Sequence, residues 1–235
     1  IYHAFSYALP FYVATFVALI TVFLSATQLT VFEQNSNNIA LLQRFNFYKR
    51  LKVLFSRRKL KNLLIVSIIF TFAVDIFYEF GPVYLTLLWQ MSPSQIAIYN
   101  TTLCFGLILG SFNLASLSFF NTRTMIIISM LITATAFGLM VLFQQVILTL
   151  FLFFLAGLGI AGTSTRLNVQ IYNNADKHIH GETIGNQFGL RMLGDSIICL
   201  LGGIMIAHNA LLPIFLSTLI AITAFIFYHR ASKNF

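Results

Sequence analysis

The sequence predicts an all-α polytopic membrane protein with about seven transmembrane helices. Hydrophobic residues make up 58% of the 235-residue chain and charged residues 9%, whereas about a quarter of the residues in an ordinary soluble domain are charged. Apolar runs of about 20 residues recur along the chain, each long enough to cross a hydrocarbon core. These runs lack the alternation of barrel strands, and lipid requires the backbone to be hydrogen-bonded internally, so the spans are expected to be helices.

Hydropathy divides the chain into three segments. A basic amphipathic loop, 31–61, separates a first transmembrane helix in 1–30 from a six-helix transmembrane bundle in 62–235. Eight of the 14 Lys and Arg residues lie between Arg44 and Lys61, a pattern expected at an anionic membrane surface rather than on nucleic acid. The seven spans are expected near 7–29, 62–88, 95–118, 124–143, 146–168, 183–207 and 210–228.

The second span, 62–88, carries two acids near its middle, Asp75 and Glu79. A charge in the membrane interior costs about 2.5 to 3.5 kcal/mol, so each acid requires a reason. The helical repeat places both acids on one polar stripe that is expected to face a wet cavity or a partner helix. The other members of the stripe are Ser67, Thr71, Tyr78 and Pro82.

Two carboxylates one turn apart repel each other, and a low dielectric disfavours their charged forms. At least one of them is therefore expected to hold a proton near neutral pH. The stripe predicts a proton-coupling or substrate-cavity site at Asp75, Glu79, Tyr78 and Thr71. The alternative is that both acids are hydrogen-bonded packing elements or pair with a cation such as Arg191.

The third span, 95–118, is expected to begin sharply at Ser92-Pro93-Ser94-Gln95. This segment has a capping serine, a proline at the first helical position and a glutamine at the third. Further along the chain, spaced glycines predict close helix contacts. They occur as Gly106/Gly110, Gly157/Gly159/Gly162 and Gly185/Gly189.

The sixth span, 183–207, contains Arg191 and Asp195 one turn apart, which allows an ion pair within the helix or a cytoplasmic gate. The preceding segment, Asp176 to Glu182, includes two histidines, but too few ligands lie nearby for a metal site, so an ordinary loop is expected. Cys104 and Cys199 lie in apolar spans and are expected to be small buried side chains. The sequence therefore predicts no metal and no cofactor.

The distribution of Lys and Arg predicts the orientation. Connections that contain Lys or Arg alternate with neutral ones along the whole chain, and the basic connections are expected in the cytoplasm. The amino end of this chain is then expected outside and the carboxy end in the cytoplasm, in a cell or inner membrane.

Two segments resemble the major facilitator superfamily. Residues 45–66 look like the basic central loop that leads into the seventh helix of these transporters, and residues 181–203 resemble the entry into helix eleven. His180 stands where the family commonly has arginine, and the loop 119–123 keeps a single arginine where the family often has an acidic and basic signature. The matching residues are Gly181, Gly185, Arg191, Gly194, Gly202 and Gly203.

The resemblance implies that the seven spans correspond to helices six to twelve of a twelve-helix fold. The chain would then be a fragment, incomplete without an N-terminal helical bundle. The expected function is secondary active transport of a small solute, proton-coupled, by rocking of two bundles around a midplane site. Two membrane acids favour drug-like cation efflux, although sugars, amino acids and other metabolites remain alternatives. The expected partners are the lipid bilayer, a small-molecule substrate and protons.

Two other classes of protein fit parts of the pattern. A seven-helix receptor shares the span number and the outside amino end, but its outer connections would be unusually short here. A non-transporting scaffold or remnant is the second alternative. The sequence contains no nucleophile elbow, phosphate-binding glycine loop or His-Glu-x-x-His motif, so no enzyme is expected.

Overall fold

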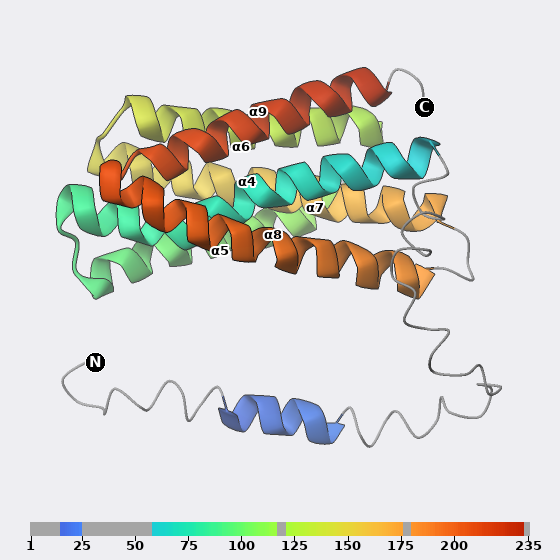
Figure 1. The fold of residues 1–235 in the computed structure, drawn as a ribbon, viewed down its shortest axis with the longest axis horizontal. Coiled ribbons are helices and arrows are strands. Elements are labelled where there is room, and N and C mark those ends of the chain that lie inside the picture. The colour runs from blue at the N-terminus through green and yellow to red at the C-terminus, as the bar shows by residue number, and fades with distance from the viewer. Residues whose placement is uncertain (1–14, 25–57, 117–120, 176–179, 233–235) are drawn as a thin grey trace. The chain divides into compact units, whose positions relative to one another are not determined.

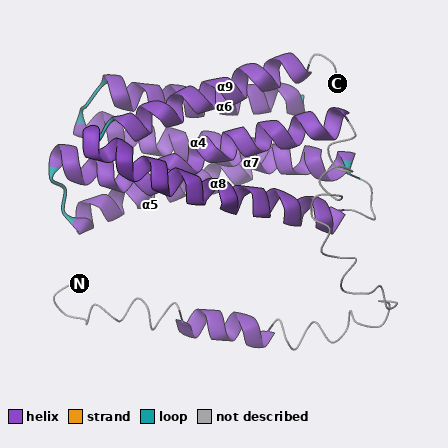
Figure 2. Ribbon diagram, viewed as in Figure 1, coloured by secondary structure: helices purple, strands orange, loops and turns teal. Residues whose placement is uncertain are grey.

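The computed structural model describes residues 15–24, 58–116, 121–175 and 180–232. Every regular element within these ranges is a helix (Figure 2). The chain forms two compact units, Ile1–Phe47 and Tyr48–Phe235. In the first unit, the helix Thr15–Leu24 lies inside the predicted span 7–29, and the rest of that span lies outside the described residues. The predicted loop 31–61 is also outside them, except for residues 58–61, which begin the next helix.

The second unit confirms the predicted all-α membrane architecture. Six helices in the described residues are long and apolar enough to cross a membrane. The largest change from the predicted spans is in the fifth, which continues past 168 to Asn174, because a hydropathy window ends where polar residues begin even when helical hydrogen bonds continue. The helices are α4 (Arg58–Trp89), α5 (Pro93–Ser116), α6 (Thr122–Leu142), α7 (Val146–Asn174), α8 (His180–His208) and α9 (Leu212–Ala231).

Consecutive helices of this unit run in opposite directions (Figure 1). In space, α5 packs on α7, α7 on α6, α6 on α9, α9 on α4 and α4 on α8, while α4 also contacts α7. The most apolar stretch of α4 is 61% buried, against 22% for α5 and 17% for α8. The corresponding stretch of α7 is 56% buried, so α4 and α7 form the centre of the bundle, and α5 and α8 form its margins.

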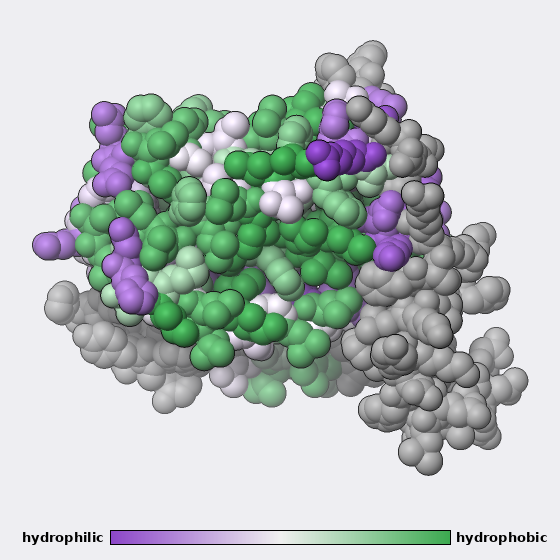
Figure 3. All heavy atoms as spheres, turned by 45° about the horizontal axis from the view of Figure 1, so that its top comes forward, coloured by the Kyte–Doolittle hydropathy of each residue, from purple (hydrophilic) through white to green (hydrophobic). Residues whose placement is uncertain are grey.

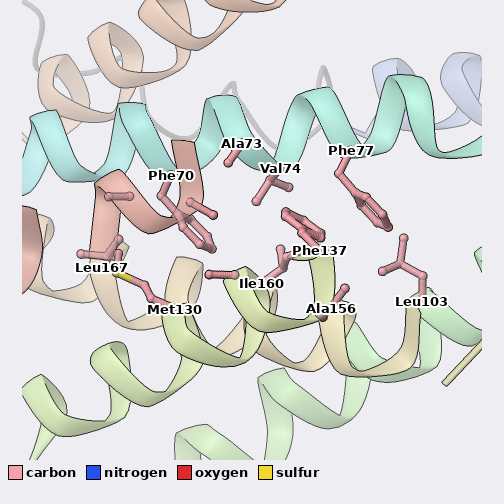
Figure 4. Close-up of a cluster of buried hydrophobic side chains, with 14 of the residues drawn as sticks. Phe70, Ala73, Val74, Phe77, Leu103, Met130, Phe137, Ala156, Ile160 and Leu167 are labelled. Atoms are coloured by element: carbon pink, nitrogen blue, oxygen red, sulfur yellow. The ribbon is translucent and has the colours of Figure 1, made fainter. Parts of the chain in front are cut away.

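The hydrophobic core lies where α4 meets α6 and α7 (Figure 4). Phe77 is 1% exposed, and its ring stacks on that of Phe137 with 4.5 Å between centroids, while Phe153 lies 5.0 Å away. Aromatic pairs at these separations are worth about 0.5 to 1.5 kcal/mol beyond the area they bury. This contact holds in place the middle of α4, the part of the helix that carries Asp75.

Charged and apolar residues are segregated on the surface of this unit. Figure 3 shows a broad hydrophobic surface between two ends where hydrophilic side chains gather. Because the helices are antiparallel, the described Lys and Arg side chains near helix ends share one end of the bundle, where α4 and α6 begin and α9 ends. They are Lys59, Lys61, Arg123 and Arg230. The alternation of basic and neutral connections predicts this arrangement, in which Lys and Arg gather at one of the two water-exposed ends.

The predicted start of α5 is confirmed in detail. The backbone N–H of Ser92 donates to Gln95 Oε1 at 2.8 Å, and the backbone N–H of Gln95 donates to Ser92 Oγ at 3.4 Å. These reciprocal bonds satisfy two of the donors that a helix start leaves free. Pro93 occupies the first helical position, where its missing N–H costs nothing.

The expectation of buried cysteines is wrong. Cys104 and Cys199 are both exposed free thiols on the marginal helices α5 and α8. An apolar span predicts that a side chain lies within the membrane, but the rotation of the helix decides whether it faces the core or the outside.

Ser217 links α9 to the centre of the bundle. Its hydroxyl is 0% exposed and donates to the carbonyl oxygen of Ala73 at 2.7 Å. We expect Ser217→Ala to lower the free energy of unfolding by about 0.6 to 1.7 kcal/mol, the range for interhelical hydrogen bonds in membranes. Unfolding in lipid bicelles measures this loss. Thr223→Ala is the matched control, because Thr223 is exposed and donates within its own helix. An equal loss in both variants would contradict the prediction.

Candidate functional site

A cavity of about 660 Å³ opens between α4, α5, α7 and α8. Its wall combines apolar side chains, such as Val74, Leu107 and Ile160, with hydroxyl and amide groups. Such a mixture is typical of small-molecule sites, in which apolar walls exclude water and a few polar groups orient the ligand. The polar lining side chains are Ser67, Thr71, Tyr78, Ser111, Ser164, Thr165, Asn168, Tyr172, Thr183, Gln187 and Arg191.

Helix α4 contributes part of the predicted polar stripe to this wall. Ser67, Thr71 and Tyr78 recur at helical spacing, so their side chains lie on one face, and all three line the cavity. Asp75 lies between them in sequence but points toward α8, where it is buried. The structure thus places Thr71 and Tyr78 at the cavity and Asp75 behind its wall.

Gln187 of α8 connects three helices at the cavity. Its Nε2 donates to Ser67 Oγ of α4 at 2.6 Å and to Asn168 Oδ1 of α7 at 3.1 Å. Both N–H groups of the amide are used in this way, so its Oε1 is left to accept from another donor. The network holds the α8 wall against α4 and α7.

Arg191, one turn beyond Gln187, pairs with Asp75 across the α4–α8 contact. Nε donates to Asp75 Oδ2 at 3.1 Å and Nη2 donates to Oδ1 at 2.5 Å. The Asp75 side chain is 5% exposed and that of Arg191 is 39% exposed. The cation therefore reaches the cavity, while the carboxylate behind it is almost completely removed from solvent.

Two pairs of glycine and phenylalanine set the approach of α8 to α4. A Cβ added at Gly194 would collide with the ring of Phe72, and one at Gly202 would collide with the ring of Phe80. Both glycines belong to the segment that resembles helix eleven of the major facilitator superfamily. Their missing side chains bring Arg191 within reach of Asp75.

The pairing of Arg191 corrects the expected ion pair within α8. Sequence spacing allowed Arg191 and Asp195 to pair, but the hydrogen bonds of the guanidinium go to Asp75 instead. Asp195 remains a close neighbour and acts electrostatically on both members of the pair. Among the described residues, no N–H or hydroxyl donor reaches its buried Oδ1.

Glu79 is not brought to this site. It is exposed on α4 and does not line the cavity. Four positions along a helix turn the side chain by about 40° and move it by about 6 Å along the axis, so Asp75 and Glu79 can meet different neighbours. The sequence placed the two acids together on one face, whereas only Asp75 meets a partner helix.

The sequence interpretation missed the contribution of α7. Ser164, Thr165 and Asn168 all line the cavity. A cluster of polar residues at the end of an apolar span was the available signal, but such clusters also occur wherever a helix leaves the membrane. From the sequence, Gln187 of the sixth span was recognisable as a candidate cavity or interhelical hydrogen-bond group, and the structure gives it both positions.

The described residues contain no group of three or more His, Cys, Asp or Glu side chains placed to hold a metal ion. Residues 176–179 of the histidine-containing loop lie outside the described ranges, so the interpretation of that loop stays a prediction.

Comparison with known proteins identifies a family from the sequence and a similar fold from solved structures. The sequence profile of the Major Facilitator Superfamily matches residues 1–203. Among solved structures, the in meso crystal structure of the POT family transporter PepTSo superposes with a TM-score of 0.63 at 14% sequence identity. The match covers 75% of this chain and 37% of that chain, so this chain spans well under half of its length. No curated protein sequence matches.

Proposed function

The chain belongs to the Major Facilitator Superfamily, and on that premise we propose that it forms part of a proton-coupled carrier of a small solute. The solute binds in the cavity between α4, α5, α7 and α8. A second helical bundle, the expected N-terminal one, closes the cavity from the opposite side. Because the chain belongs to this family, we no longer consider the seven-helix receptor that the number of spans suggested. The alternative of a non-transporting remnant is tested by the experiment below.

The observation that carries the proposal is the imbalance between acidic and basic groups at the cavity wall. Two carboxylates, Asp75 and Asp195, lie near one guanidinium, that of Arg191, which donates both of its hydrogen bonds to Asp75. With both acids ionised, the cluster holds one excess negative charge in a membrane interior, where uncompensated charge is costly. A single bound proton balances it, and that proton also provides the missing donor for a carboxylate oxygen without one.

The position of the cluster couples this proton to the solute. Arg191 faces the cavity and Asp75 lies behind it, so a solute that contacts the guanidinium changes the field at both carboxylates. Rocking of the two bundles then exposes the cavity and the proton site to opposite sides in turn. In the proposed orientation, the basic end of the bundle lies in the cytoplasm.

The experiment measures solute-evoked proton flux in proteoliposomes that contain the full-length protein. The variants are Asp75→Asn and Asp195→Asn, which remove the titratable groups while keeping their size. We expect each variant to lose solute-driven proton movement while solute exchange without a pH gradient persists.

Glu79→Gln is the matched control, because it neutralises an acid on the same helix as Asp75 that lies outside the cluster. Its proton flux should equal that of the original protein. Coupled flux that survives both aspartate substitutions would eliminate the cluster as the proton site. A full-length protein that moves no solute under any gradient would favour the non-transporting alternative.

A further inference from the structure

The charged side chains at the cavity are of one sign. Arg191 is the one charged side chain among its described lining residues. Three acids of the bundle have described side chains, and none of them, Asp75, Glu79 or Asp195, lines the cavity. A low-dielectric cavity that exposes a cation and hides the acids attracts an anion and repels a second cation.

The hydrogen bonds of Arg191 leave one edge of its guanidinium open. A guanidinium has five N–H groups in a plane and can bind two carboxylates along two different edges. Asp75 occupies the edge formed by Nε and Nη2. Nη1 donates no hydrogen bond to any described residue, so the edge formed by Nη1 and Nη2 remains for a ligand in the cavity.

The surroundings of this edge suit the rest of an organic acid. Gln187 and Thr183 precede Arg191 on the same face of α8, one and two turns away, and both line the cavity. Gln187 offers its Oε1 as an acceptor, since both hydrogens of its Nε2 are already donated. Val74 and Ile160 form part of the apolar wall of the cavity. The site therefore offers a cation, hydrogen-bonding groups and an apolar surface.

We infer that the transported solute is a small organic anion, whose carboxylate or similar oxyanion binds the Nη1/Nη2 edge of Arg191. The inference rests on the proposed function, because it names the substrate class of the same cavity. It replaces the expectation from sequence that two membrane acids favour a cation. Asp75 neutralises part of the positive charge of Arg191 from behind, and this keeps the solute from binding too tightly to be released.

This arrangement predicts opposite effects of one substitution on binding and on coupling. Asp75→Asn removes the carboxylate that competes for the guanidinium, so the affinity for an anionic solute should rise by about tenfold, on the order of one charge-assisted hydrogen bond. A purely structural role for the pair predicts weaker binding in this variant. The double variant Asp75→Asn/Arg191→Gln removes both charges and should lose the preference for carboxylates.

The experiment measures binding to the full-length protein in lipid nanodiscs. The probes are carboxylates from acetate to adipate and phenylacetate, each with the amide and the amine of the same carbon skeleton. Thermal unfolding shifts find the probes that bind, and titration gives their dissociation constants. The variants are Asp75→Asn and Asp75→Asn/Arg191→Gln, with Glu79→Gln as the control that should match the original protein.

Carboxylates that bind at least about tenfold tighter than their amides and amines, with higher affinity in Asp75→Asn and no preference in the double variant, would support the inference. Tighter binding of amines or amides, together with solute transport, would overturn the substrate class while leaving the carrier function intact. An absence of both binding and transport for every probe would overturn the carrier function and the inference with it.

Discussion

Replacing Gly157 by alanine is expected to destabilise the bundle by about 3 kcal/mol or more, at the upper end of the cost of overpacking. A Cβ at Gly157 would collide with the backbone carbonyl oxygen of Leu103 and lie 3.0 Å from the backbone nitrogen of Leu107. Backbone atoms cannot rotate away as the end of a side chain can, so α5 and α7 would have to separate. Their contact is the closest approach of α5 to the bundle, because α5 contacts α4 only weakly.

The same contact is tight from the side of α5. A Cβ at Gly106 would collide with the carbonyl oxygen of Phe154, and one at Gly110 would lie 2.6 Å from that of Leu158. We therefore expect Gly106→Ala to be as damaging as Gly157→Ala. Glycines that let two backbones meet are a common way to pack helices in lipid, where the hydrophobic effect does not draw them together.

Gly189→Ala is the matched control for these substitutions. Gly189 lies inside α8, and a Cβ there would meet no atom within 4 Å. Alanine should be neutral or slightly stabilising at that position, since it is the better helix former. Reversible unfolding in bicelles measures the difference. Equal stabilities of Gly157→Ala and Gly189→Ala would show that the close approach of α5 and α7 does not hold the bundle together.

Replacing Arg191 by alanine is expected to cost about 3 to 5 kcal/mol of stability, the usual result of removing one partner from a buried ion pair. Asp75 would keep its buried position without the two hydrogen bonds that now satisfy its carboxylate. Most of this cost is the penalty of an unpaired charge rather than the net value of the pair. A neutral replacement of both residues should therefore be much less damaging.

The double variant Asp75→Asn/Arg191→Gln tests this reasoning in a mutant cycle. It should recover most of the stability lost in Arg191→Ala, since the amides keep hydrogen bonds without leaving a charge. Unfolding free energies of Asp75→Asn, Arg191→Gln and the double variant provide the cycle, and Arg191→Ala is measured beside them. A double variant as unstable as Arg191→Ala would mean that the pair stabilises the fold by its charges.

Several features of the fold were predictable because they depend on neighbouring residues. The start of α5 at Ser92 to Gln95 needs only four residues and their mutual hydrogen bonds. The prediction of the described spans required only that apolar runs be long enough to cross a membrane. The segregation of Lys and Arg to one end followed from the alternating connections and the antiparallel order of the helices.

The partners of the polar residues were less predictable, because they depend on the rotation of each helix about its axis. Asp75 and Arg191 are 116 positions apart in the chain, and the sequence could name Arg191 only as one possible partner of the two acids on α4. Gly106 and Gly189 are both parts of spaced glycine pairs, but only Gly106 meets another helix in the described bundle. A pattern of small or polar residues predicts that a helix face makes a contact, but it does not identify the helix on the other side of that contact.

The sequence by itself therefore determined that the chain is a bundle of membrane helices of the major facilitator type, with Asp75, Glu79, Arg191 and Asp195 as charges in need of partners. The tertiary structure alone decided that Asp75 pairs with Arg191, that Asp195 lies beside them and that Glu79 stands apart. The physical reason is the difference in range. Hydropathy and capping act within one helix, whereas the pairing of buried charges depends on which helices pack together and how each is turned.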